Sequence, residues 1–193
     1  LDASRSVVRP YLEELEADPP TDEIAELARE LTVGETYFLR HGDQFRAFVD
    51  VSLPDRMRAQ RDARRLRLLS AGCASGEEAY SLAMLIREQA PLQTWDVSIL
   101  GVDVNPAVLE KAVRARFSAW ALRETPPAIQ ERWFRRDGRE AVLDDALRTA
   151  VKFEQRNLVD AEPALWSPAT YDVVFCRNVM MYFTPENAKA LID

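Results

Sequence analysis

The chain has 193 residues, of which 47% are hydrophobic and 30% are charged, and its formal net charge is −7. This composition is typical of a globular domain, and the acidic excess argues against nucleic acid as a partner. No segment has the roughly 18 consecutive apolar residues that a membrane-spanning helix needs, so we expect no membrane insertion.

Residues 7–31 have the apolar spacing of two short helices. Pro19-Pro20 interrupts the first apolar stripe, and Thr21 has the features of a new helix start. Two short helices bury little apolar surface by themselves. We therefore predict a small, shortened N-terminal helical subdomain over residues 1–33.

The next stretch, residues 34–65, is predicted to be a linker followed by a helix. The linker contains an aromatic pair that could close over a ligand, and it ends at Arg40, which can bind a carboxylate through two hydrogen bonds. A plain hinge with a surface arginine explains the same residues equally well. The helix is expected over residues 43–65, with an interruption near Pro54. Its arginines are better explained by a solvated helix face than by a basic surface for an acidic substrate.

A strand, a loop of small residues and a helix are predicted over residues 66–87. Gly72 and Gly76 can adopt backbone angles that other residues avoid, and small side chains let a ligand lie against the backbone. In a doubly wound sheet this corner binds nucleotide-like ligands. The loop lacks the glycine spacing of the phosphate-binding motifs, and Glu77 and Glu78 would repel a phosphate. A ligand with a cationic end therefore fits this corner better.

A second apolar strand is predicted over residues 95–102, with Asp103 at its carboxyl end. Asn105-Pro106 has the pattern of a helix N-cap and first helical residue, which leaves Asp103 without a capping role. A carboxylate at this position can accept hydrogen bonds from both hydroxyls of a ribose. A ribose, a positive group and no phosphate together suggest S-adenosylmethionine.

The middle of the chain is predicted to be connecting helix and loop, with Trp120 and Trp133 as packing residues. Asp137-Gly138 predicts a hairpin turn and hence a small antiparallel insertion near residues 135–155.

Two more strands are predicted, over residues 151–155 and 171–176, and a helix is expected to begin near Pro185. The second of these strands should form an open edge of the sheet. Such an edge promotes association, so we expect a dimer partner or a further chain segment to cover it.

Four blocks of the sequence resemble the CheR family of chemotaxis receptor methyltransferases. They occur in the family's order and span most of the chain, and the last block is the most specific. The blocks are Gly34-Glu-Thr-Tyr-Phe-Leu-Arg40, Ser70-Ala-Gly-Cys-Ala-Ser-Gly-Glu-Glu-Ala-Tyr-Ser81, Gly101-Val-Asp-Val-Asn-Pro-Ala-Val-Leu-Glu-Lys-Ala112 and Phe175-Cys-Arg-Asn-Val-Met-Met-Tyr-Phe183.

The resemblance implies an α/β fold of the class I S-adenosylmethionine-dependent methyltransferases. This fold is a Rossmann-like doubly wound sheet, here truncated at its C-terminal strands. The methyltransferase domain would span residues 66–193.

The resemblance also implies roles for individual residues. S-adenosylmethionine would be the cofactor and S-adenosylhomocysteine the product, with no metal. Asn157 and Leu158 would contact the adenine, and Glu78 would attract the methionyl ammonium. Arg40 and Tyr182 would position the substrate and are the catalytic candidates. The cofactor-binding candidates are Thr36, Arg40, Gly72, Ala74, Glu78, Asp103, Asn157, Leu158, Arg177 and Asn178.

The implied substrates are glutamate side chains on the cytoplasmic helices of chemoreceptors. A glutamate carboxylate is already ionised at neutral pH, so its in-line attack on the methyl group needs no general base, and alignment dominates catalysis. With a single histidine and two cysteines, the chain lacks a histidine-based triad and most zinc sites, and a reducing, cytoplasmic location is expected.

Two alternatives stay open. One is a catalytically weak or inactive CheR-like module that binds the cofactor and regulates. The family often has asparagine where this chain has Gly34, and this departure favours such a module. The other is a methyltransferase that acts on a different substrate.

Overall fold

The computed structural model describes residues 9–13, 15, 21–89, 92, 94–160 and 163–192. The chain forms two compact units, Leu1–Val33 and Gly34–Asp193. Every helix in the described part is too short or too polar to cross a membrane.

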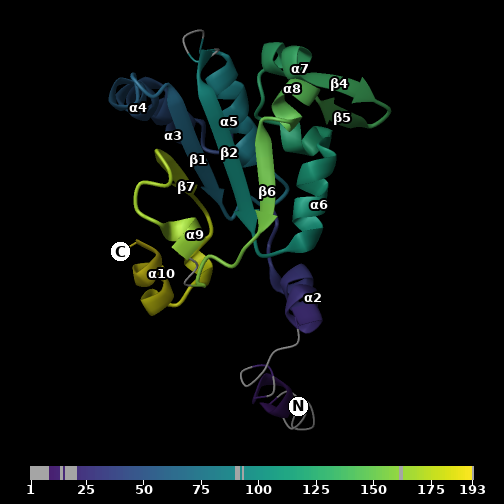
Figure 1. The fold of residues 1–193 in the computed structure, drawn as a ribbon. Helices are drawn as coiled ribbons and strands as arrows, with labels where there is room; N and C mark the ends of the chain where they lie inside the picture. Colours follow the sequence, from purple (N-terminus) through teal and green to yellow (C-terminus); the bar gives the residue numbers. More distant parts are fainter. Residues whose placement is uncertain are drawn as a thin grey trace. The chain divides into compact units, whose positions relative to one another are not determined.

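The first unit is helical where the structure describes it. Residues 9–13 form a helix, and α2 spans Thr21–Leu31, which confirms the predicted helix start at Thr21 (Figure 1). The beginning of the first predicted helix and Pro19-Pro20 lie outside the described residues. The division of the chain into residues 1–33, 34–65 and 66–193 stays a prediction.

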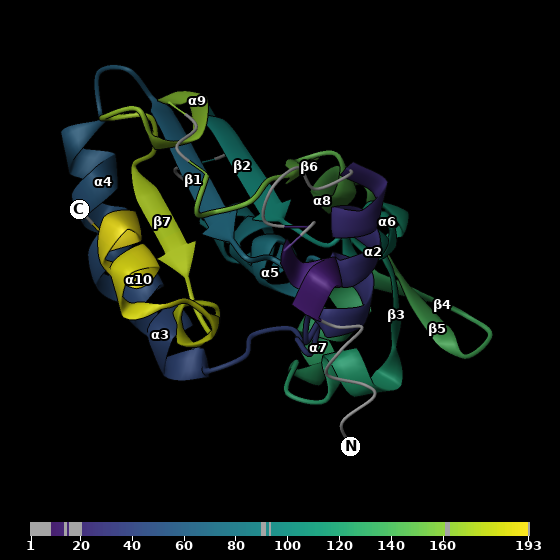
Figure 2. The same cartoon turned by 90° about the horizontal axis from the view of Figure 1, so that it is seen from below.

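A four-stranded parallel sheet organises the second unit, with the strand order β6-β2-β1-β7. This confirms the predicted α/β class with a doubly wound sheet. The chain proceeds outward from β1 to β2 and β6, and then returns to the other side of β1 for β7, which is an edge strand as predicted (Figure 2). The strands are β1 (Arg65–Ala71), β2 (Asp96–Asp103), β6 (Val151–Gln155) and β7 (Val173–Cys176).

The residues of β1 alternate between two hydrophobic cores, as the side chains of a strand must. Leu66 and Leu68 belong to the larger core, which includes most of the buried side chains of α5 (Glu77–Arg87). Leu69 and Ala71 belong to the smaller core on the other side. Because both faces are covered, apolar residues of β1 face both cores, and Ser70 is buried among them.

The remaining helices of this unit flank the sheet, and Figure 1 shows how they are arranged. The predicted N-cap of α6 at Asn105 is confirmed, as is the predicted helix start near Pro185. The elements are α3 (Gly42–Ala47), η1 (Phe48–Ser52), α4 (Leu53–Ala59), α6 (Pro106–Arg114), α9 (Pro163–Trp166), η4 (Met180–Tyr182) and α10 (Pro185–Ile192).

The helical stretch after the linker differs from the prediction. It ends at Ala59 rather than at residue 65, because β1 already begins at Arg65. α3, η1 and α4 follow one another without a break, and the π-helical segment η1 ends at Ser52, two positions before Pro54, which has no N–H to donate to the preceding turn. This confirms the predicted interruption near Pro54.

A second, antiparallel sheet has the strand order β3-β5-β4. The predicted hairpin turn is confirmed, with Gly138 at φ +61°. The sheet begins at Arg116, earlier than the insertion expected near residues 135–155, because β3 pairs with β5. Its elements and neighbours are β3 (Arg116–Ser118), η3 (Ala119–Leu122), α7 (Pro127–Trp133), β4 (Phe134–Asp137), β5 (Glu140–Leu143) and α8 (Asp145–Arg148).

One of the two predicted packing tryptophans is misassigned. Trp133 is half-buried against the larger core, as predicted. Trp120 is 64% exposed, so the prediction for this residue is wrong. The Arg123 guanidinium covers one face of its ring instead.

Candidate functional site

The predicted small-residue corner lies at the carboxyl end of β1. The backbone N–H groups of Gly72 and Cys73 donate to the Val102 carbonyl oxygen, at 2.8 and 2.9 Å, so the loop is attached to β2. Gly72 has φ +75° and Gly76 has φ +92°, angles that side chains disfavour. A Cβ on Gly76 would lie 2.9 Å from the Cβ of Ala112, so glycine is also required for α5 to approach α6.

Asp103 contacts this corner directly. Its Oδ2 accepts a hydrogen bond from the Ala74 N–H at 2.9 Å, and its Oδ1 accepts one from the Asn105 N–H at 2.9 Å. The prediction that a cap at Asn105 leaves Asp103 free is therefore only half right. Asn105 does cap α6, by accepting from the N–H of Ala107, but Asp103 also holds the loop.

Burial raises the pKa of the Asp103 carboxyl, although the backbone N–H groups of Asn105, Ala74 and Val104 oppose this shift. Because the pKa is higher in the folded state, the folded state binds this proton more tightly than the unfolded chain. The resulting contribution to stability is complete below the unfolded pKa and is lost as the pH rises through the folded pKa.

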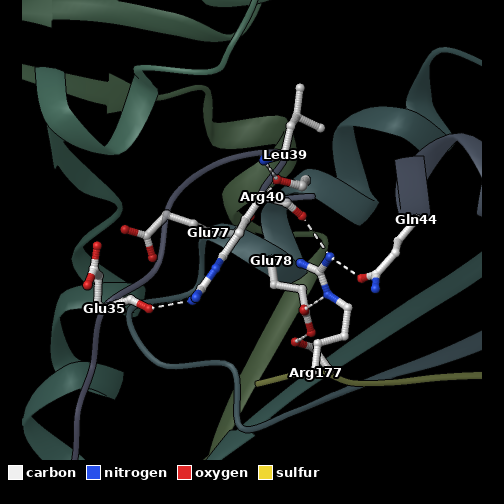
Figure 3. A network of polar contacts seen from close by, with 9 residues as sticks. Glu35, Leu39, Arg40, Gln44, Glu77, Glu78 and Arg177 are labelled. Atoms are coloured by element: carbon white, nitrogen blue, oxygen red, sulfur yellow. Dashed lines mark hydrogen bonds and ion pairs between the residues drawn. The ribbon is translucent and has the colours of Figure 1, made fainter. Parts of the chain in front are cut away.

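A buried polar network joins β1, the start of α5 and the residue that follows β7 (Figure 3). Glu78 Oε1 accepts from the Ser70 hydroxyl at 2.7 Å, and Glu78 Oε2 accepts from Arg177 Nε at 2.6 Å. The two side chains of this ion pair, Glu78 and Arg177, are only 10% and 12% exposed. The carboxylate that sequence analysis assigned to a ligand's ammonium is therefore already neutralised by an arginine.

Arg177 connects this network to the linker and to α3. Its Nη1 donates to the Arg40 carbonyl oxygen at 2.7 Å and to Gln44 Oε1 at 2.8 Å (Figure 3). Its guanidinium carbon lies 4.7 Å from the centre of the Phe45 ring. Sequence reasoning missed Gln44, which has no distinguishing pattern around it. It also missed Ser70 as a partner, although a hydroxyl in a buried strand needs one.

The linker residues are anchored on α5. The Leu39 N–H donates to the Ser81 hydroxyl at 3.0 Å, and this hydroxyl donates to the Glu77 carbonyl at 2.6 Å. The Arg40 guanidinium donates to the Glu35 carbonyl at 2.8 Å, within its own segment (Figure 3). Thr36 is half-buried between these anchors.

The other predicted site residues follow β6 and β7. Asn157 is held in a local turn, where its amide donates to Asp160 Oδ1 at 2.9 Å, and Leu158 is buried in the smaller core. Asn178 and Tyr182 are exposed beyond the end of β7. Among the hydrogen bonds of the described residues, none joins the side chain of Asn157, Asn178 or Tyr182 to the Asp103 or Arg177 networks.

Four of the seven described non-glycine residues with positive φ lie on the linker, in the corner or after β7, and the other three, Arg64, Ala115 and Ala169, lie elsewhere. Leu39 and His41 on the linker have φ +58° and +59°, Ala74 in the corner has φ +47°, and Asn178 has φ +55°. Residues with side chains rarely adopt these angles, and such strain clusters at functional sites. Nothing in the sequence marks an alanine or a leucine for this conformation.

The two cysteines also lie near this edge of the sheet, and both are free thiols. Burial raises the pKa of Cys73 and of Cys176, which disfavours the reactive thiolate. Over the described residues there is no cluster of histidine, cysteine, aspartate or glutamate that could hold a metal ion.

The corner offers acceptor groups for the hydroxyls of a nucleoside. A carboxylate has about four acceptor positions, so Asp103 keeps capacity for ligand hydroxyls beyond its backbone partners. A Cβ on Gly72 would lie 3.0 Å from the Val179 side chain, so glycine is needed here for Val179 to pack against the loop. The free acceptor capacity of Asp103 is compatible with the ribose of S-adenosylmethionine.

Comparisons with known proteins agree with this chemistry. Residues 34–193 match the family described as "CheR methyltransferase, SAM binding domain". Chemotaxis protein methyltransferase 2 of Vibrio cholerae serotype O1 is 34% identical over 178 residues, which cover 91% of this chain and 61% of that protein. A probable chemotaxis protein methyltransferase of Rhizobium etli is 30% identical over 163 residues, which cover 82% of this chain and 60% of that protein. The chain thus spans about three fifths of the length of these curated relatives.

Among solved structures, the methyltransferase domain of bacterial CtHen1-C is 17% identical and gives a TM-score of 0.37. The match covers 72% of this chain and 54% of that chain. This likeness is too low to bear on the fold.

Proposed function

Because the chain belongs to the CheR methyltransferase family, we propose that it transfers a methyl group from S-adenosylmethionine to glutamate side chains on the cytoplasmic helices of chemoreceptors. The observation that carries the proposal is the contact between Asp103 and the glycine-bearing corner, 2.9 Å from Oδ2 to the Ala74 N–H. The relatives named as chemotaxis methyltransferases support the class of substrate. A cytoplasmic location and a chain that covers the β7 edge remain parts of the same proposal.

In this proposal the carboxyl ends of β1, β2 and β6 hold the nucleoside. Asp103 accepts hydrogen bonds from the ribose hydroxyls, and the Asn157 amide and the Leu158 side chain contact the adenine. Gly72 and Ala74 provide the close backbone surface. When bound, S-adenosylmethionine supplies a methyl group that its sulfonium charge activates.

The linker and the end of β7 hold the methionyl end. Glu78 attracts the ammonium, and its pairing with Arg177 fixes the direction in which its carboxylate points. Thr36 and Asn178 contact the cofactor in this proposal, and Arg40 binds the methionyl carboxylate. The net charge of the Glu78–Arg177 pair is near zero, so orientation contributes more than charge here.

The substrate glutamate needs no general base, because its carboxylate is ionised at neutral pH. The task of the protein is to align this carboxylate, which can be worth several orders of magnitude in rate. Arg40 can bind a carboxylate through two parallel hydrogen bonds, and the exposed Tyr182 can close over the substrate side chain.

The first experiment measures S-adenosylmethionine binding by calorimetry for the natural protein, Asp103→Asn and Asp96→Asn. Asp96 begins the same strand that Asp103 ends, so it is a matched control at the opposite end of β2. We expect Asp103→Asn to weaken binding about 100-fold, since the charge is lost and one of the two acceptor oxygens is replaced by a donor NH2 group. We expect Asp96→Asn to bind normally. For the natural protein, affinity should fall as the pH is lowered through the raised pKa of Asp103.

The second experiment tests transfer of a labelled methyl group to a purified chemoreceptor cytoplasmic fragment. Label should appear as a base-labile ester, and it should be absent when the acceptor glutamates are replaced by alanine. Cofactor binding without any ester would favour the regulatory module instead. Equal affinities for Asp103→Asn and the natural protein would refute the ribose assignment.

A further inference from the structure

Arg123 lies between two aromatic rings in the turn after η3. Its guanidinium carbon is 3.6 Å from the ring centre of Tyr37 and 4.0 Å from that of Trp120. Its Nη1 donates to the Trp120 carbonyl oxygen at 2.8 Å, and its Nη2 is 3.8 Å from Glu35 Oε1. Guanidinium groups are weakly hydrated and stack well on aromatic faces, so this arrangement is favourable.

The stack joins two segments that are distant in sequence. Tyr37 belongs to the linker, whereas Trp120 and Arg123 belong to the connection between β3 and α7. A backbone bond from the Phe38 N–H to the Ala121 carbonyl, at 2.9 Å, lies beside the stack. Burial of apolar surface does not explain the position of Trp120, because its side chain stays mostly in water. Its stacking on the Arg123 guanidinium does explain this position.

The linker needs such a restraint. Leu39 and His41, on either side of Arg40, both have positive φ, which a free chain would avoid. Thr36 precedes Tyr37 directly. A contact at Tyr37 therefore acts on a short, strained segment that carries both of its proposed site residues.

We propose that Arg123 is a positioning residue that acts as a clamp: its guanidinium stacks on both Tyr37 and Trp120 and thereby fixes Thr36 and Arg40 for cofactor and substrate binding. The second half of this statement rests on the proposed function. The clamp itself does not rest on the proposed function, since it concerns only how firmly residues 35–41 are held in one conformation.

The test compares Arg123→Ala with Arg132→Ala in the full chain. Arg132 is a matched control: its guanidinium lies 5.0 Å from the Trp133 ring centre and pairs with Glu88 at 2.6 Å. Its described contacts do not include the linker. Hydrogen exchange measured by mass spectrometry over peptides that contain residues 35–41 shows whether Arg123 restrains the linker. The affinity for S-adenosylmethionine and the KM and kcat of methyl transfer show whether that restraint affects binding and catalysis.

We expect Arg123→Ala to speed exchange over residues 35–41 at least tenfold and to raise the Kd and the KM for S-adenosylmethionine about tenfold. Arg132→Ala should change neither. Arg123→Lys should restore part of the affinity, because an ammonium also stacks on aromatic rings. The effects of Arg123→Ala and Tyr37→Ala should not add, because both remove the same contact.

Equal exchange over residues 35–41 in Arg123→Ala and Arg132→Ala would overturn the clamp. Faster exchange with unchanged affinity and KM would overturn its role in positioning. If the natural protein bound no S-adenosylmethionine, the proposed function would fail, and the exchange comparison would still decide the clamp.

Discussion

The two sheets of this protein each hold an arginine between polar partners, but in opposite surroundings. Arg177, at the end of the parallel sheet, pairs with Glu78 at 2.6 Å, and the side chains are 12% and 10% exposed. Arg116, in the antiparallel sheet, pairs with Asp137 and Glu140 at 2.8 Å each, and these side chains are 38% to 50% exposed. The same chemical pair therefore has a structural role in one sheet and a minor one in the other.

The difference follows from where each pair lies in the fold. Arg177 follows β7 at the point of the sheet where the strand order reverses, and it links β7 to α5, α3 and the linker. Arg116 contacts residues of the neighbouring hairpin, and water already solvates all three groups. Removing one partner leaves an unpaired buried charge in the first case and a hydrated charge in the second.

The largest effect is expected for Glu78→Ala. This change leaves the Arg177 guanidinium buried without a counter-charge, which should cost about 3–5 kcal/mol of unfolding free energy. Urea unfolding followed by circular dichroism measures this loss. Ser70→Ala serves as the control, since it removes one neutral hydrogen bond to the same carboxylate and should cost about 1 kcal/mol. A loss for Glu78→Ala no larger than that for Ser70→Ala would mean that water replaces the carboxylate.

A pair of glycine substitutions compares the loop that follows β1 with the hairpin turn between β4 and β5. Gly76→Ala combines strain at φ +92° with a Cβ placed 2.9 Å from Ala112, whereas Gly138→Ala meets open space at φ +61°. We expect about 2–4 kcal/mol for Gly76→Ala, from backbone strain and overpacking, and about 1 kcal/mol for Gly138→Ala. Thermal unfolding of both variants measures the difference. Equal losses would show that strain alone matters and that α5 can move away from α6.

The smallest effect is expected for Arg116→Ala. Because the group is exposed, the unfolding midpoint should shift little, and the shift should vanish at high salt. The pKa of Asp137, which Arg116 lowers, should rise toward its ordinary value, as titration by nuclear magnetic resonance would record. A lowered pKa stabilises the fold above the unfolded pKa and loses this effect as the pH falls, so the variant should be less sensitive to acid. A large loss of stability at neutral pH would contradict the comparison.

The parts of the fold that could be predicted from the sequence are those determined by residues close together along the chain. The strand, small-residue loop and helix at residues 66–87, the cap at Asn105 and the hairpin at Gly138 each have a local chemical signature. Asp103 was identified by its place at a strand end, and that position does bring it against the corner.

The parts that could not be predicted depend on contacts between distant residues. Glu78 and Arg177 are 99 positions apart, so their pairing has no sequence pattern. β3 is three residues long and is recognisable only through its partner β5. A tryptophan in an apolar stretch is normally buried, and the exposure of Trp120 is explained only by the Arg123 guanidinium, on which both Trp120 and Tyr37 stack.

The two ends of Arg40 are held very differently. Its carbonyl oxygen is fixed by the buried Arg177, whereas its guanidinium lies 5.7 Å from the Tyr37 ring centre and, within the described part of the chain, hydrogen-bonds only to the neutral carbonyl of Glu35. A carboxylate is a stronger acceptor than a carbonyl, so an arriving acidic group can displace this bond. The main chain of Arg40 then stays bonded to Arg177, while its guanidinium changes from one acceptor to another. Exchange of one acceptor for another at this guanidinium then requires rotation of the Arg40 side chain and no movement of its main chain.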